Sequence, residues 1–152
     1  MAGMVQPSHT VFAGDSLMAA HMRSHRWQHC ALGPPALWAP SLRTAVDMML
    51  HSSFPMFIAW GPQRIFLYND AFMALYPDRH PAALGQPFAE VWAEVWDRLS
   101  PLFDRALDGH GVFFEDLELT LARRGFPEPA WFTFSYTPLH DADGSVAGLS
   151  CT

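Results

Sequence analysis

Apolar residues recur at helical spacing in the first third of the chain. They occupy one side of residues 17–26, where Asp15 or Ser16 is placed to cap a helix. They also occupy one side of residues 42–50, where Ser41 is the N-cap candidate. The proline-rich segment between these stretches is expected to be an ordered loop. Two short helices therefore precede the rest of the fold.

The spacing then changes to that of strands. Short apolar runs at 55–60 and 65–69, bounded by Pro and Gly, predict a hairpin. Asn69 closes the second run, and its side chain can accept a hydrogen bond from the first turn of a helix over 70–76. Asn69 is therefore predicted to be a structural cap.

A second helical region follows a turn-rich connector. An apolar stripe covers residues 88–99. Ser100 and Pro101 then have the order of a cap and a first helical residue, and they predict a further helix that ends at Gly109.

The last third of the chain alternates between apolar and polar residues. This pattern predicts strands over 111–123, 130–139 and 145–152. Strands that are neighbours in sequence pair antiparallel, so the predicted fold class is α+β rather than a parallel α/β fold.

Composition narrows the class of protein. Half of the 152 residues are hydrophobic and 16% are charged, which is typical of a globular domain. The net charge is −6 and the basic residues form no stripe, so no nucleic-acid partner is expected. No apolar run is long enough to span a membrane and no secretory signal is visible, so no membrane insertion is expected. Cys30 and Cys151 lie far apart and are expected to be free thiols in the cytoplasm.

Eight histidines raise the question of a metal site. His21, His25 and His29 are spaced four apart and would share one helix face, a geometry that can bind zinc. No carboxylate completes the set, and a solvated helix face is the plainer interpretation. No metal is expected.

Glu115 disturbs the alternation of its strand. Strict alternation places it on the same face as the apolar Phe113, Leu117 and Leu119. Either a bulge rotates Glu115 out, or it is a partly buried carboxylate that needs a donor and could serve in acid–base chemistry. Motifs for nucleophiles and phosphate cradles are absent, so no catalytic residue is assigned and no enzyme is expected.

Aromatic residues make up 14% of the chain, and many fall on the inward side of the predicted elements. They indicate either a packed core or an apolar cavity for a small molecule, with Tyr136 as its polar group. A void of roughly 300 Å³ or more would favour the cavity. It is expected between the sheet and residues 88–109. The candidate lining residues are Trp96, Leu99, Phe103, Phe114 or Leu117, Phe134 and Tyr136.

Two long segments resemble the PAS domain family of sensory modules. LYNDAFMALYPDRHPAALGQPFAEVW (67–92) is similar to the hairpin exit, Asn-capped helix and connector of PAS domains. FTFSYTPLHDADGSVAG (132–148) is similar to a PAS strand, its turn and the final strand. Upstream, residues 32–50 and 54–72 resemble the amino-terminal PAS regions of bacterial sensor and hybrid histidine kinases.

The resemblance implies a five-stranded antiparallel sheet with helices covering one face, preceded by N-terminal helices. It implies ligand sensing, dimerisation and relay to a downstream kinase transmitter domain; the alternative is a ligand-free dimerisation or protein-interaction module with a filled core. The cofactor stays unknown. The Cys motif of flavin-binding PAS domains is missing and no histidine lies within 88–109, where haem-binding members place their ligand, so neither flavin nor haem is expected.

The expected organisation has three parts. Residues 1–15 form a flexible arm, 16–53 an N-terminal helical extension, and 54–152 the PAS core. The extension is expected to pack on the outer face of the sheet or across a dimer, and Trp131 should lie on that face. The chain ends within a strand and carries no kinase motif, so we expect a cytoplasmic regulatory fragment of a longer, homodimeric signalling protein.

Overall fold

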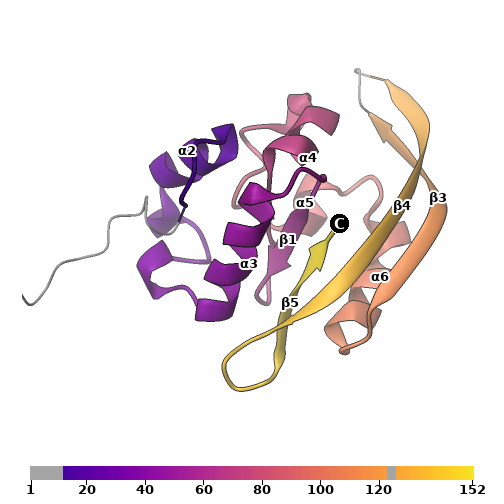
Figure 1. The fold of residues 1–152 in the computed structure, drawn as a ribbon. Coiled ribbons are helices and arrows are strands. Elements are labelled where there is room, and N and C mark those ends of the chain that lie inside the picture. The colour runs from indigo at the N-terminus through magenta and orange to yellow at the C-terminus, as the bar shows by residue number, and fades with distance from the viewer. Residues whose placement is uncertain (1–11, 123–125) are drawn as a thin grey trace, which may run out of the picture.

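Five antiparallel strands form one sheet in the order β2-β1-β5-β4-β3 (Figure 1). The computed structural model describes residues 12–122 and 126–152. The predicted α+β class and five-stranded antiparallel sheet are confirmed. The strands are β1 (Phe57–Trp60), β2 (Ile65–Tyr68), β3 (Val112–Ala122), β4 (Pro127–His140) and β5 (Val146–Cys151).

Among the described residues, the helices follow the predicted order, two before the first hairpin and three after it. In the described ranges they are α2 (Leu17–Ser24), α3 (Pro40–His51), α4 (Asp70–Leu75), α5 (Phe88–Val91) and α6 (Trp96–Leu107), with 3-10 turns at Trp27–His29, Pro35–Leu37 and Pro77–Arg79. Within these ranges, every helix is too short or too polar to cross a bilayer.

The start of α3 differs from the prediction. Ala39 is the N-cap and Pro40 is the first helical residue, while the Ser41 hydroxyl is buried with no hydrogen-bond partner among the described residues. Proline is favoured at this position because its missing N–H would have no partner there in any case. Ser41 therefore lies one residue inside the helix that it was predicted to cap.

The helical region after the connector also divides at a different place. A turn at 92–95 separates α5 from α6, and α6 then continues through Pro101 without a break. In one continuous helix, Trp92 and Trp96 would share a face, because they are four residues apart. Because the turn separates them, they have different neighbours. The Trp92 ring packs against Tyr76 and the Trp96 ring against Phe103, with ring centroids 4.9 and 5.0 Å apart, respectively.

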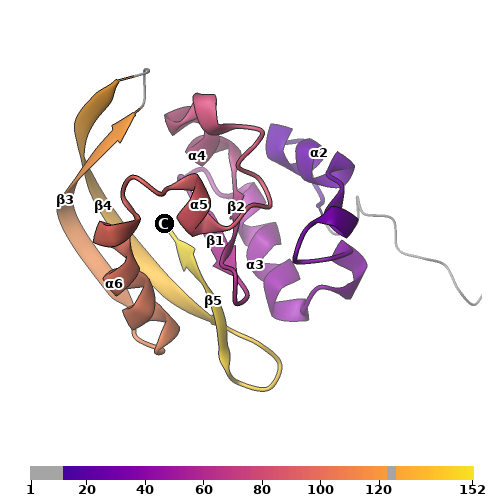
Figure 2. The same cartoon turned by 180° about the vertical axis from the view of Figure 1, so that it is seen from behind.

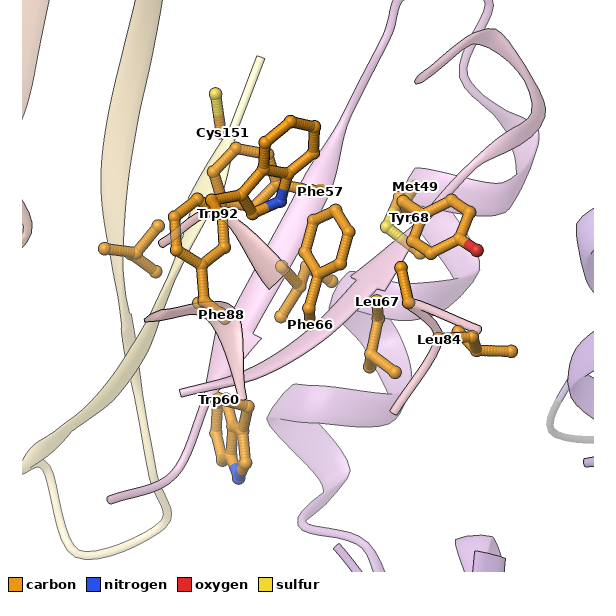
Figure 3. Packing of buried hydrophobic residues seen from close by; sticks show 14 of the residues in the cluster. Met49, Phe57, Trp60, Phe66, Leu67, Tyr68, Leu84, Phe88, Trp92 and Cys151 are labelled. Atoms are coloured by element: carbon orange, nitrogen blue, oxygen red, sulfur yellow. The ribbon is translucent and has the colours of Figure 1, made fainter. Parts of the chain in front are cut away.

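The sheet lies between two helical layers. The segment α4–α6 covers one face, and α3 lies on the opposite face of β1 (Figures 1 and 2). The α3 helix contacts β1, β2 and β4. Figure 3 shows Phe57, Phe66, Phe88 and Trp92 gathered in the core, and the Phe57 ring centroid lies 5.0 Å from that of Phe88 and 5.5 Å from that of Phe66. The aromatic residues noted in the sequence thus largely form packed core.

The predicted arm over 1–15 falls mostly outside the described residues. Phe12, the first described residue, is fully buried. Its ring lies 5.9 Å from Trp27 and 5.4 Å from Trp38. The end of the predicted arm is therefore anchored in a small aromatic cluster beside α2.

Candidate functional site

A cavity of about 260 Å³ lies against the face of the sheet that α4–α6 cover. The β4 strand pairs with β5 from Tyr136 to His140, while its earlier part, which carries Phe132 and Phe134 of the lining, pairs with β3. The described lining residues are Phe54, Pro55, Phe57, Phe72, Leu75, Tyr76, Trp92, Val95, Leu99, Leu119, Leu121, Phe132, Thr133, Phe134, Tyr136, Cys151 and Thr152.

The cavity includes part of the set of residues predicted from sequence. Leu99, Phe134 and Tyr136 line it. The other predicted residues, which are absent from the described lining, are Trp96, Phe103, Phe114 and Leu117.

Side-chain packing accounts for this difference. The fully buried Phe103 ring lies 4.6 Å from Phe88 and 5.1 Å from Tyr136, measured between centroids. Together with Trp96, these rings fill the space around Phe103 of α6.

Within the predicted region between the sheet and residues 88–109, the cavity is bordered by Trp92, Val95 and Leu99. It also reaches α4, whose Phe72 and Leu75, together with the C-cap Tyr76, were not predicted to line it. Leu75 and Tyr76 follow Phe72 by three and four residues, a spacing that places the three side chains on one helix face and could have identified them.

Tyr136 supplies one of the polar groups of the cavity. Its hydroxyl forms no hydrogen bond with another described residue, although the side chain is almost fully buried. Burial raises the pKa of Tyr136 well above its usual value, and the neighbouring Cys151 adds to this. Burial also raises the pKa of the Cys151 thiol. Both groups are therefore neutral at physiological pH.

Trp92 forms one wall of the cavity. The Arg79 guanidinium lies 4.2 Å from the centroid of the indole ring, a cation–π geometry. Arg79 also donates to the Val91 carbonyl and pairs with the Glu94 carboxylate. The indole nitrogen is buried without a hydrogen-bond partner among the described residues, and the ring meets Tyr76 edge to face.

Asn69 holds two edges of the cavity in place. Its side-chain oxygen accepts from the backbone N–H of Phe72 at 3.0 Å, which is the predicted helix cap, and from that of Met56 at 3.1 Å. Its amide nitrogen donates to the carbonyls of Phe54 and Met49, at 2.8 and 2.9 Å. Phe54 and Phe72 both line the cavity. The capping residue thus ties the end of α3, the start of β1 and the first turn of α4 together.

The alternative interpretations of Glu115 are decided by a β-bulge. The β3–β4 register shifts between Phe114 and Leu117, so Glu115 and Asp116 together face Thr133. Asp116 takes a positive φ of 52° and its N–H donates to the Thr133 hydroxyl at 3.2 Å. Glu115 is exposed, and the interpretation of a partly buried carboxylate is wrong. The extra residue keeps Leu117 and Leu119 on the inward face.

The three spaced histidines do not share a helix face, because α2 ends at Ser24. His21 instead contacts His80 of the core, with ring centroids 4.8 Å apart, and His80 Nδ1 lies 2.8 Å from the Tyr68 hydroxyl. Partial burial, with His21 as the second cause, lowers the pKa of both His25 and His80. In the described part of the chain, no three metal-ligating side chains lie close enough to hold an ion.

Comparisons with known proteins agree with this architecture. A family model described as the PAS fold matches residues 50–152. No curated protein sequence matches the chain significantly.

Three solved structures illustrate the likeness of fold. An RNA-binding light-oxygen-voltage receptor is 21% identical with a TM-score of 0.53, over 80% of this chain and 33% of that one. A sensory box sensor histidine kinase from Vibrio cholerae is 18% identical with a TM-score of 0.50, and the match covers 72% of this chain and 83% of that one. A phage VqmA–DPO complex is 20% identical with a TM-score of 0.54, and the match covers 72% of this chain and 50% of that one. The chain thus spans a third of the first of these proteins and half of the last.

Proposed function

Since this chain belongs to the PAS fold family of sensory domains, we propose that it senses a small molecule in the cavity between the sheet and α4–α6. The observation that carries the proposal is the Tyr136 hydroxyl, which lines the cavity and has no hydrogen-bond partner among the described residues. The hydroxyl oxygen is not fully buried, so a molecule in the cavity can reach it. A hydrogen bond to this hydroxyl contributes about 0.5–1.5 kcal/mol.

The proposed signal leaves the cavity through Asn69. A ligand that moves Phe54 or Phe72 acts on the hydrogen bonds that Asn69 makes to both residues. The next residue, Asp70, accepts the backbone N–H groups of Leu17 and Met18 in α2. Two adjacent side chains thus connect the cavity to α3 and α2.

In this proposal residues 54–152 are the sensory core and 16–53 the extension that transmits the signal. The chain is the regulatory part of a bacterial, cytoplasmic, homodimeric histidine kinase, and the partner is the downstream transmitter domain. The similarity of fold to the Vibrio cholerae sensor kinase is consistent with this role. Catalysis then belongs to the transmitter and not to this chain.

Filling the cavity tests the proposal. Val95 lines the cavity and is buried, so Val95→Phe adds a ring to it. Leu37→Phe is the matched control, because Leu37 is 81% exposed and does not line it. Native mass spectrometry of the purified protein is expected to detect a bound small molecule in the wild type and in the control. The same molecule should be absent from Val95→Phe. A wild type with no bound molecule, and with a thermal melt that metabolite mixtures do not shift, would refute the proposal.

A second candidate function is a dimerisation module with a filled core. It is favoured by the packed rings of Phe88, Trp96 and Phe103, by a cavity slightly below 300 Å³, and by two exposed aromatic residues on the other face of the sheet. These are Phe113 and Trp131, which are 65% and 61% exposed. Trp131 lies on the outer face as predicted, but α3 does not cover it. If Phe113→Ser and Trp131→Thr convert a dimer to a monomer in sedimentation, and no ligand is found, this second function holds.

A further inference from the structure

The side chains that line the cavity are uncharged. No Asp, Glu, Arg or His lies among the described residues that border it. The nearby guanidinium of Arg79 lies over Trp92 and is engaged by Val91 and Glu94. Because burial keeps the Tyr136 hydroxyl and the Cys151 thiol protonated, neither can supply a charge.

An uncharged wall discriminates strongly against ions. A carboxylate or ammonium group that enters such a site loses its hydration and gains no opposite charge, which costs several kcal/mol even after relaxation. An uncharged ligand has no such cost. The side chains of the lining therefore favour a neutral ligand over an anionic or a cationic one.

The size and shape of the walls restrict the ligand further. An apolar cavity of roughly 150 Å³ is large enough to hold benzene. The 260 Å³ found here has room for one or two fused rings. Aromatic side chains supply walls from several elements, including Phe57, Phe72, Trp92 and Phe134. Flat rings pack against such walls in offset or edge-to-face arrangements.

The polar groups of the lining are few. The Thr133 hydroxyl already accepts the Asp116 N–H. Among the described residues, the Trp92 indole nitrogen and the Tyr136 hydroxyl both lack a partner, but the indole nitrogen is fully buried, so the hydroxyl is the group that a ligand can reach. We infer that the cavity selects a neutral aromatic molecule of one or two rings with one hydrogen-bonding group, which pairs with Tyr136. This inference rests on the proposed function and assigns its ligand class.

Three probes that share one ring system test the ligand class. Indole is neutral, indoleacetate is an anion and tryptamine is a cation at neutral pH. Calorimetric titration into the wild-type chain is expected to give a dissociation constant for indole at least about tenfold lower than for either charged analogue. Val95→Phe should abolish the binding, because its ring occupies the same space.

The role of Tyr136 has its own variant and control. Tyr136→Phe removes only the hydroxyl and should weaken indole binding about two- to tenfold. Tyr68→Phe is the control, because the Tyr68 hydroxyl pairs with His80 and Tyr68 does not line the cavity. Unchanged indole affinity in Tyr136→Phe would refute the pairing with Tyr136.

The outcomes separate this inference from the proposed function. A charged analogue that binds as tightly as indole overturns the ligand class, but leaves a small-molecule site in place. No binding by any probe also overturns the ligand class. The proposed function fails with it only if native mass spectrometry finds no molecule bound to the wild type.

Discussion

The Asp70 carboxylate accepts a hydrogen bond of 2.7 Å from the backbone N–H of Met18, 52 residues earlier in the chain. The first N–H groups of a helix have no partner within it, and a carboxylate placed there also favours the helix dipole. Ser16, the N-cap of α2, accepts from Ala19 at 3.0 Å. One side chain of the core thus completes the cap of the N-terminal extension.

Replacing Asp70 with Asn should loosen α2. The charge is lost and one of the two acceptors becomes a donor, so we expect the free energy of unfolding to fall by about 0.5–2 kcal/mol. Urea titration measures the loss, and hydrogen exchange should localise it to the amides of α2. The control is Asp47→Asn, an exposed carboxylate on α3, which should change stability by less. Equal exchange of α2 amides in both variants would contradict the prediction.

Asn69→Ala should cost more than a helix cap alone. A cap is worth about 1 kcal/mol, but Asn69 also satisfies three further backbone groups and is only 1% exposed. Because the buried groups lose their partners, we expect a loss of about 2–4 kcal/mol in urea titration. Asn69→Asp keeps both acceptor contacts and loses both donors, so it should be intermediate. A loss of about 1 kcal/mol or less in the Ala variant would mean that water replaces the amide.

Because Asp116 lies in the bulge, two substitutions of this residue should have opposite effects on thermal stability. Asp116 has a positive φ, which glycine adopts without strain and which costs a β-branched residue about 1–2 kcal/mol. Asp116→Gly should therefore preserve or raise the thermal midpoint, and Asp116→Val should lower it. Glu118→Val, in the regular part of β3, is the control and should be tolerated. The bulge would be in doubt if Val were accepted equally at both positions.

Acid should weaken the attachment of α2. His25 and His80 have lowered pKa values in the folded chain, so below the ordinary value of 6.5 the unfolded chain binds more protons. The free energy of unfolding is therefore highest with respect to these two groups above pH 6.5, and it decreases as the pH falls below that value. The groups facing these rings are His21 of α2, Asp70 of α4 and the Tyr68 hydroxyl, and only Asp70 opposes the shift at His80.

Thermal melts at neutral pH and about one unit below 6.5 test this expectation. The wild type should lose stability across this interval. His80→Gln should lose less, and the exposed His110→Gln should behave as the wild type. A wild-type midpoint that rises toward acid would have the wrong sign.

The elements themselves were largely predictable from sequence because they depend on residues a few positions apart. The alternation of β4, the cap of α4 by Asn69 and the cap of α2 by Ser16 are local patterns, and the structure has each of them. The bulge was one of the two interpretations of Glu115 from the sequence. One extra residue in the strand returns Leu117 and Leu119 to the apolar face.

The position of the cavity required the tertiary structure. A cavity is the small difference between the space that several elements enclose and the side chains that fill it. No local pattern encodes that difference: rings such as Phe103 fill part of the predicted region between the sheet and residues 88–109, while Leu99 in the same region borders the cavity. The pairing of β5 with β1 and the contact of Asp70 with Met18 join residues distant in sequence. Sequence by itself thus determined the elements and the family. Packing between elements decided which of the predicted residues, Leu99, Phe134 and Tyr136, share a cavity.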